Sequence, residues 1–204
     1  MSSPNFFASF SSRQEVAWIT RSFSKIICFA LFFIQKISLD IQGVDVAVHS
    51  TVPHSSGLSS LAALEIALLR SLTQLHGLSL KPQEMAKIGQ QIEHQFVGTQ
   101  CGIMDQMVSA CGSIRQAIFL DCESLQTKSL PLFSNHTFIV IHSGSSRKLS
   151  QGSYNERKEE TTVASKTLNV PSLRYASSDQ INLIKEPIIR KRAKHIIFEN
   201  DRVI

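Results

Sequence analysis

The segment PHSSGLSSLAALE, residues 53–65, joins a serine-rich turn to a stretch with helical periodicity. Leucines recur from there at intervals of three and four residues, namely Leu61, Leu64, Leu68, Leu72 and Leu75. This spacing predicts a helix with one apolar face, which ends at His76-Gly77. Either Ser59 or Ser60 is expected to cap its first turn, because a serine hydroxyl can accept a hydrogen bond from the free backbone amides there.

The amino end of such a helix combines unpaired N–H groups with a partial positive charge, which together favour phosphate binding. The turn before the helix is therefore a candidate phosphate site. An ordinary capped helix after a surface loop would have the same pattern, because serine-rich caps are common.

Composition sets the outer limits on fold and function. The chain has 204 residues, of which 43% are hydrophobic, enough for one sizeable core or two small ones. The net charge of +5 is modest, and the basic run Arg190–Lys194 lies among isoleucines, which favours a solvated helix face over a nucleic-acid site. The four cysteines lack metal-ligand spacing, which favours reduced thiols in a cytoplasmic protein.

The first forty residues have no clear period, apart from the apolar run Ile26–Ile34. This run is shorter than the roughly 20 residues that span a bilayer. A signal peptide is an alternative, since Arg21 and Lys25 precede the run, but no small-residue cleavage site follows and Glu15 lies in the leader. We expect a helix buried on every side, and no membrane contact.

Further elements follow from periodicity. The alternation in Gln42–Val52 predicts a strand. A second helix opens at Pro82 and ends at Gly98, with Glu93 sheltered at the border of its apolar face. The residues that form this face are Met85, Ile88, Ile92 and Phe96. A short helix follows with Asp105 in its first turn, where helix amides favour an ionised carboxylate. Its predicted core residues are Ile103, Met107 and Ala110.

The remaining chain has two β-branched apolar runs, Gln116–Leu120 and Thr137–Ile141, which both predict strands. The charged segment Tyr154–Leu168 predicts an exposed helix. A last helix is expected from Ile181 to the end, with a kink near Pro187.

Four ordered segments resemble signatures of the galactokinases, which belong to the GHMP small-molecule kinase superfamily. They are Val52–Glu65, Cys101–Gln106, Ser153–Arg157, and Arg192–His195 with Glu199–Val203. Together they cover about Gly43 to Ile204, in the order and with the spacing of that family. The segment Cys101–Gln106 favours the sugar-1-kinase branch over relatives that act on N-acetylgalactosamine or mevalonate.

The resemblance implies an α+β GHMP-kinase fold, incomplete in this chain. A ribosomal protein S5 domain 2-like amino-terminal lobe would be followed by the start of a carboxy-terminal lobe. Residues 1–40 would be a poorly matched segment with an apolar helix. Residues 41–135 would form the rest of the nucleotide-binding lobe, and 136–204 the beginning of a truncated carboxy-terminal lobe.

The resemblance also assigns roles to residues, with ATP, Mg²⁺ and galactose or a related sugar as ligands. The phosphate cradle would comprise Ser55, Ser56, Gly57, Leu58, Ser59, Ser60 and Leu61. Glu93 would bind Mg²⁺, which needs only one or two carboxylates. Asp105 would accept the proton of the sugar's anomeric hydroxyl. Gly102 and Tyr154 would line the sugar pocket together with Asp105.

Each of these residues has a simpler alternative role. Glu93 could be a solvated helix residue, Asp105 could only stabilise its own helix, and Tyr154 could anchor its helix.

The chain departs from the family pattern at several positions. Leu61 replaces a serine that in the family is the second protein ligand to Mg²⁺, and Ser55 replaces a glycine. Met1–Asp40 also contains nothing like the family's sugar-gripping signature.

Two kinds of function therefore follow from the sequence. The first is galactokinase-type transfer of the ATP γ-phosphate to the C1 hydroxyl of galactose, expected to be impaired or absent in this chain. The second is a non-catalytic regulator that binds galactose or ATP, or an inactive fragment of a GHMP sugar kinase.

Overall fold

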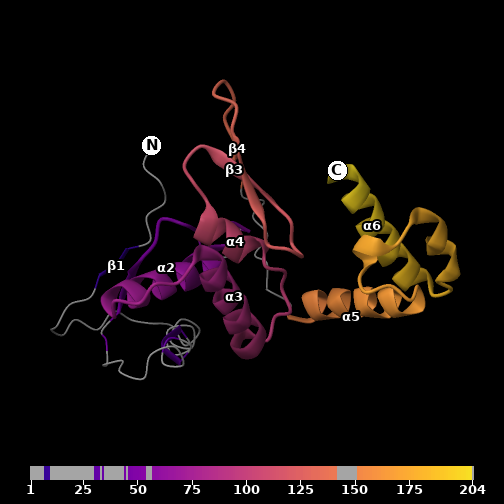
Figure 1. Ribbon diagram of the computed structural model, residues 1–204, viewed down its shortest axis with the longest axis horizontal. Coiled ribbons are helices and arrows are strands. Elements are labelled where there is room, and N and C mark those ends of the chain that lie inside the picture. The colour runs from indigo at the N-terminus through magenta and orange to yellow at the C-terminus, as the bar shows by residue number, and fades with distance from the viewer. Residues whose placement is uncertain are drawn as a thin grey trace. The chain divides into compact units, whose positions relative to one another are not determined.

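The structure is a computed structural model, and it describes residues 7–9, 30–32, 34, 44, 46–53, 57–141 and 151–203. The chain divides into two compact units, residues 1–149 and 150–204. The described elements are helices and short antiparallel strand pairs, in keeping with the predicted α+β class (Figure 1). No helix among the described residues is both long and apolar enough to cross a membrane.

Three helices form the core of the first unit. They are α2 (Ser60–Leu75), α3 (Pro82–Ile92) and α4 (Met104–Cys111), which pack against one another (Figure 1). The largest side chains fully buried among them are Leu64, Leu68, Leu69, Leu72, Ile92 and Met107. The leucine stripe of α2 and the core face of α4 are thus confirmed. Leu75 is the exception, because at 48% exposure it lies beyond the buried part of the stripe.

The predicted ends of these helices are also found. His76 and Gly77 follow α2 directly, and Gly77 has a φ of +64°, which favours glycine. Pro82 is the first residue of α3. Beyond Ile92 the helix continues as a π-helical segment, η1 (Glu93–Val97), and Gly98 ends it with a φ of +78°. The apolar periodicity of this segment does not indicate the change to π-helical hydrogen bonding.

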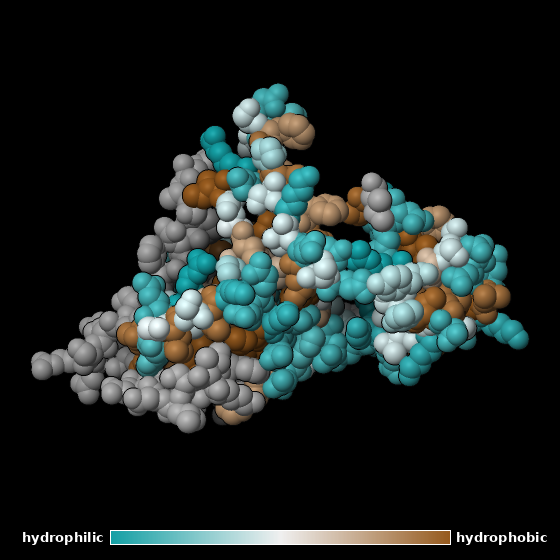
Figure 2. Space-filling view, in the orientation of Figure 1, coloured by the Kyte–Doolittle hydropathy of each residue, from teal (hydrophilic) through white to brown (hydrophobic). Residues whose placement is uncertain are grey.

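Among the described residues, two antiparallel strand pairs complete the first unit. Strands β1 (Phe7–Ser9) and β2 (Ala47–His49) pair antiparallel. Of the strand predicted at Gln42–Val52, only these three residues of β2 are strand among those described. Strand β3 (Gln116–Leu120), at its predicted position, pairs antiparallel with β4 (Thr127–Pro131). Figure 2 shows apolar and hydrophilic residues mixed at the surface of this second strand pair.

The strand predicted at Thr137–Ile141 is wrong. These five residues have no regular secondary structure, and Phe138 and Ile139 are 77% and 80% exposed. A strand needs a partner for its N–H and C=O groups. No strand of the described residues pairs with this run, so its β-branched composition alone did not produce one.

The apolar run Ile26–Ile34 lies mostly outside the described residues. Residues 30–32 and 34 are helical, and Ala30 and Ile34 are fully buried, as expected of a core helix. Phe32 is 41% exposed and packs edge-to-face on Phe96 of η1, with ring centroids 6.4 Å apart. Complete burial of this run on every side was therefore an overestimate.

The second unit packs two helices around a small core. These are α5 (Gln151–Thr167), largely exposed as predicted, and α6 (Pro187–Val203). Between them lie the 3₁₀ turns η2 (Leu173–Tyr175) and η3 (Ser178–Leu183). Its buried apolar residues are Ala164, Leu168, Leu173, Ile181, Ile184, Ala193 and Ile197. The predicted kink at Pro187 is wrong: Pro187 begins α6, where its missing N–H costs nothing.

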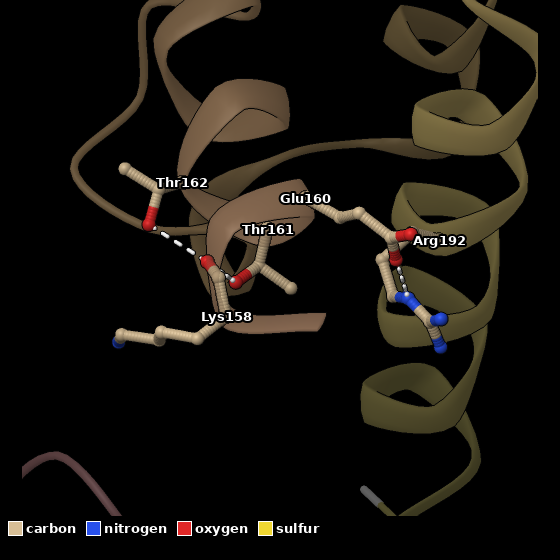
Figure 3. A network of polar contacts seen from close by, with 5 residues as sticks. All are labelled: Lys158, Glu160, Thr161, Thr162 and Arg192. Atoms are coloured by element: carbon tan, nitrogen blue, oxygen red, sulfur yellow. Dashed lines mark hydrogen bonds and ion pairs between the residues drawn. The ribbon is translucent and has the colours of Figure 1, made fainter. Parts of the chain in front are cut away.

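An ion pair joins α5 to α6. Arg192 Nε donates to Glu160 Oε2 over 2.6 Å, and both side chains are more than two-thirds buried (Figure 3). On the same turns of α5, the hydroxyls of Thr161 and Thr162 both donate to the carbonyl of Lys158, at 2.7 and 2.8 Å. These contacts lie within the second unit.

Candidate functional site

Glu93 occupies the first position of η1, where the α-helical hydrogen bonding of α3 ends. Its main-chain carbonyl accepts from the N–H groups of Gly98 and Thr99, the latter over 3.2 Å. π-helical segments within α-helices frequently occur at functional sites. The side chain is only 8% exposed, so the solvated helix residue that the sequence left as an alternative does not describe Glu93.

The loop after η1 is held to α3 and η1 through a single carbonyl oxygen. Gln90 Nε2 donates to the carbonyl of Cys101 over 3.1 Å, and His94 Nε2 donates to the same oxygen over 2.9 Å. Since a carbonyl only accepts, His94 carries a proton on Nε2. Gln90 and His94 are four residues apart and so lie on one face of the helix. Together they fix the loop that leads to Gly102, Ile103 and α4.

Gln106 connects two buried carboxyl groups. Its side chain is fully buried, and Nε2 donates to Glu93 Oε1 over 2.8 Å and lies 3.4 Å from Glu65 Oε2. The sulfur of Cys101 is 4.0 Å from the same nitrogen, and the Cys101 thiol also bonds to Glu93. Three separate elements, α2, η1 and α4, thus meet at one amide.

Glu65 is fully buried on α2, among the leucines of the core. Burial and the neighbouring Glu93 raise the pKa of Glu65 to about 9, against a smaller opposing effect of the Gln106 hydrogen bond. Glu65 is therefore protonated at neutral pH. Among the described residues, neither Oε1 of Glu65 nor the amide oxygen of Gln106, both buried, has a hydrogen-bond partner. A buried polar group without a partner costs free energy, so this cluster does not serve stability alone.

The charge of Asp105 affects the ionisation of Glu93. Burial raises the pKa of Glu93, and the charge of Asp105 raises it further, while the Cys101 thiol lowers it. Asp105 is half-buried in the first turn of α4. A cation beside Glu93 would favour the charged form of its carboxyl group, which burial and the charge of Asp105 disfavour. This fits Mg²⁺, which binds through one or two carboxylates and keeps waters and phosphate oxygens as its other ligands.

A complete protein cage for a metal is not present. Within the described ranges, no group of three or more His, Cys, Asp or Glu side chains could hold a metal ion.

The first turn of α2 lies next to this acidic cluster. Leu61 and Glu65 are four residues apart on α2 and therefore share a face. Glu65 interacts with Glu93 both directly by charge and through Gln106. Leu61 itself is half-buried and packs against the core.

The predicted phosphate cradle is described in part. Ser55 and Ser56 lie outside the described residues. Gly57 has a φ of +78° and Ser59 a φ of +53°, so two left-handed residues flank the exposed Leu58. Ser59 is the N-cap of α2, but the predicted hydroxyl cap is wrong: no side-chain hydrogen bond is made. A capping serine needs extended backbone angles, and the left-handed conformation of Ser59 does not provide them.

Besides Asp105, the predicted sugar pocket comprises Gly102 and Tyr154, and the structure describes the surroundings of both residues. Gly102 is exposed in the loop before α4, and no heavy atom lies within 4 Å of the Cβ that a larger residue would place there. Tyr154 belongs to α5 of the second unit and is 38% exposed. Their roles toward a sugar remain predictions.

Sequence reasoning missed four residues of this cluster: Glu65, Gln90, His94 and Gln106. One signal was present for Glu65, because it is an acidic residue at a spacing that otherwise carries leucines. Gln106 follows Asp105 in the matched segment but has no charge to mark it. The contacts of Gln90 and His94 depend on the fold of the loop around Cys101, which periodicity does not reveal.

Comparison with known proteins gives two findings. Residues 24–113 match the family of GHMP kinases, N terminal domain. The fold is similar to the crystal structure of Lactococcus lactis galactokinase complexed with galactose, with a TM-score of 0.77 and 26% sequence identity. The similarity covers 94% of this chain and 51% of that chain, so this chain spans about half the length of the galactokinase. The chain is therefore galactokinase-like in fold, and its residues 24–113 match the GHMP kinase N-terminal domain.

Proposed function

We propose that the chain carries the ATP site and the reaction centre of a galactokinase-type sugar-1-kinase. The observation that carries this proposal is the buried Glu93 carboxyl, which Gln106 links to Glu65 of α2 and whose ionisation the charge of Asp105 affects. The galactokinase with a similar fold was crystallised with galactose, which supports galactose as the sugar to test first.

The proposed reaction moves one phosphoryl group. The bond between the γ-phosphorus of ATP and the oxygen that bridges it to the β-phosphate breaks, and ADP leaves. A new bond forms between that phosphorus and the anomeric oxygen of the sugar, and the hydroxyl proton passes to the carboxylate of Asp105. Such transfers depend mainly on positioning and on neutralising charge. Asp105 is half-buried at the start of α4, so it is accessible to a substrate while held by a helix.

The turn at residues 57–59 would hold the phosphates. Backbone with left-handed residues in a turn gathers N–H groups into anion-binding concavities, and the helix amino end behind it adds a partial positive charge. Gly57 and Ser59 have such angles directly before α2. Glu93 would bind Mg²⁺, which supplies charge neutralisation on the phosphates.

One observation favours a second function, binding without turnover. The position of Leu61 offers no oxygen for a cation, and its side chain packs against the core instead. Poor positioning of the reacting groups can by itself cost about 100-fold in rate. A chain with this substitution could bind ATP and galactose as a regulator and transfer phosphate slowly or not at all.

Calorimetric titrations and product analysis separate these proposals. The whole chain is titrated with ATP–Mg²⁺ and with galactose, and galactose 1-phosphate is followed by phosphorus NMR. The kinase proposal predicts binding of both ligands and product that disappears in Asp105→Asn, which should still bind ATP. Binding of both ligands without product supports the regulator. If neither ligand binds, both proposals are wrong.

A further inference from the structure

Gln106 is placed to control how the Glu93 carboxylate is presented. Its amide nitrogen lies 2.8 Å from Glu93 Oε1, and its side chain is fully buried. A carboxylate that binds a cation must hold one oxygen toward it, and hydrogen bonds from neighbouring groups fix this orientation. The 2.8 Å contact engages Oε1 of Glu93 and so restricts rotation of the whole carboxylate.

Glu65 holds the other side of the same amide. Its Oε2 lies 3.4 Å from Gln106 Nε2, so the two hydrogens of the NH₂ group have one carboxyl acceptor each. Glu65 of α2 thus holds the Gln106 amide, and the same amide contacts Glu93 of η1.

Stability alone does not explain an acidic residue at this position. A leucine or methionine at position 65 would continue the apolar face of α2, whereas a carboxyl in the core loses its hydration. Glu65 Oε1 has no hydrogen-bond partner to offset that loss. Replacing buried polar clusters with apolar residues is often neutral or stabilising. The arrangement therefore calls for a role other than holding the fold together.

Gly89 on α3 permits the close packing of this cluster. A Cβ at position 89 would lie 3.1 Å from Gln106 Cγ and 3.4 Å from Glu65 Oε2. A distance of 3.1 Å is tighter than ordinary van der Waals contact, so any larger residue would push the Gln106 side chain aside. The fold thus provides the space that the Gln106 side chain fills.

We infer that Gln106, anchored by Glu65, is a positioning residue that orients Glu93 for the magnesium ion of ATP–Mg²⁺. This inference rests on the proposed function, because it takes Glu93 as the magnesium ligand. Neither Gln106 nor Glu65 contacts the ion in this scheme. Loss of such an outer hydrogen bond lowers metal affinity by roughly 10- to 100-fold.

The test measures ATP affinity of the whole chain by calorimetry, with Mg²⁺ and with EDTA. The magnesium enhancement is the dissociation constant for ATP in EDTA divided by the dissociation constant for ATP with Mg²⁺. We expect Gln106→Leu to reduce this enhancement about 10-fold or more while affinity for metal-free ATP changes less than about twofold. The matched control is Thr73→Val, which removes a buried hydroxyl of α2 that bonds only to the main-chain carbonyls of Leu69 and Arg70. It should leave the enhancement unchanged.

A second pair of variants keeps the inference testable if Gln106→Leu fails to fold. Glu65→Met removes the anchor but keeps the size of the side chain, and should reduce the enhancement. Glu65→Gln retains an acceptor oxygen for Gln106, and should preserve it. A purely structural role predicts instead that any loss follows the melting temperature of each variant.

The possible failures are distinct. If the unaltered chain does not bind ATP, or binds it without any magnesium enhancement, the proposed function fails at Glu93 and this inference falls with it. If the unaltered chain shows the enhancement but Gln106→Leu or Glu65→Met retains it within twofold, only the positioning role is wrong. Equal losses in Glu65→Met and Glu65→Gln would also overturn the positioning role.

Discussion

Gly89 of α3 faces Gln106 of α4 so closely that a Cβ on Gly89 would lie 3.1 Å from Cγ of Gln106. Gly89 is buried in the middle of a helix, where glycine is normally unfavourable by about 1 kcal/mol relative to alanine. Gln106 has little freedom to move away, because its amide bonds to carboxyl groups on two other elements. Contact with Gln106 therefore outweighs helix propensity at this position.

Gly89→Ala is expected to destabilise the chain despite the better helix propensity of alanine. Overpacking a tight core costs about 1–3 kcal/mol, which exceeds the gain of about 1 kcal/mol from propensity. Urea unfolding of the variant measures the net effect. Gln91→Ala, at an exposed position of α3, is the control and should change stability by less than about 0.5 kcal/mol. A more stable Gly89→Ala would show that Gln106 moves without cost.

Glu65→Gln should change the pH dependence of stability. The unfolded chain releases the Glu65 proton near pH 4.5, and the folded chain holds it until about pH 9. The contribution of Glu65 to stability is therefore fully present below pH 4.5 and is lost as the pH rises toward 9. One such group gives a slope of at most about 1.4 kcal/mol per pH unit, which the glutamine variant lacks.

Urea unfolding of both proteins between pH 5.5 and 8.5 tests this dependence. The free energy of unfolding of Glu65→Gln minus that of the unaltered chain should increase steadily with pH. A difference that stays constant over this range would mean that Glu65 titrates normally in the folded state.

Leu72 and Leu75 belong to the same predicted stripe but should respond very differently to truncation. Leu72 is fully buried in the core of the first unit, and Leu75 is 48% exposed at the end of α2. Leu72→Ala should lower the free energy of unfolding by about 2–5 kcal/mol, because it leaves a cavity. Leu75→Ala should cost about 0.5 kcal/mol or less. Similar losses in the two variants, measured by urea unfolding, would contradict the burial difference.

These two leucines also illustrate how far the sequence determines the fold. Spacing located α2, α3 and α4, because each must bury an apolar face and the period of that face is set by helix geometry. Pro82 and Gly98 indicated helix ends because of their own backbone properties: proline lacks an N–H group, and glycine readily adopts a positive φ. Leu75 belongs to the predicted apolar stripe but is 48% exposed, because burial near a helix end depends on what packs there, which periodicity does not contain.

Interactions between distant segments were much harder to foresee. The run Thr137–Ile141 has the composition of a strand, but strand formation depends on a pairing partner elsewhere in the chain. The Glu65–Gln106–Glu93 contacts join residues up to 41 positions apart, and no local pattern marks them. Glu93 and Asp105 were selected through resemblance to galactokinases, whereas their surroundings became visible only in the structure.

The Arg192–Glu160 ion pair should contribute measurably to the second unit. Its side chains are 28% and 21% exposed, so solvent screens the pair only in part. A double-mutant cycle with Arg192→Met and Glu160→Gln should give a coupling of about 1 kcal/mol. The control is Arg202–Glu199, whose side chains are 74% and 42% exposed, and its coupling should be below about 0.5 kcal/mol and vanish at high salt. Equal couplings would contradict the role assigned to burial.

Leu61→Ser tests whether the first turn of α2 lacks an oxygen that the proposed ATP–Mg²⁺ site could use. Leu61 shares a helix face with Glu65 and so lies on the side of α2 that meets the acidic cluster. A serine hydroxyl there could act as an additional magnesium ligand, and we expect the magnesium enhancement of ATP affinity to rise about 10-fold, equivalent to about 1.4 kcal/mol. Some stability will be lost, because Leu61 packs against the core.

Leu61→Ala separates these two effects, since it removes the same apolar contact but offers no oxygen. Both variants should lose about 1–2 kcal/mol of unfolding free energy, in proportion to the apolar area that Leu61 buries. Only Leu61→Ser should gain magnesium enhancement in calorimetric titrations with ATP. Because a hydroxyl can improve ATP binding only where phosphates and the cation are actually held, equal enhancement in the two variants would place the nucleotide away from the first turn of α2.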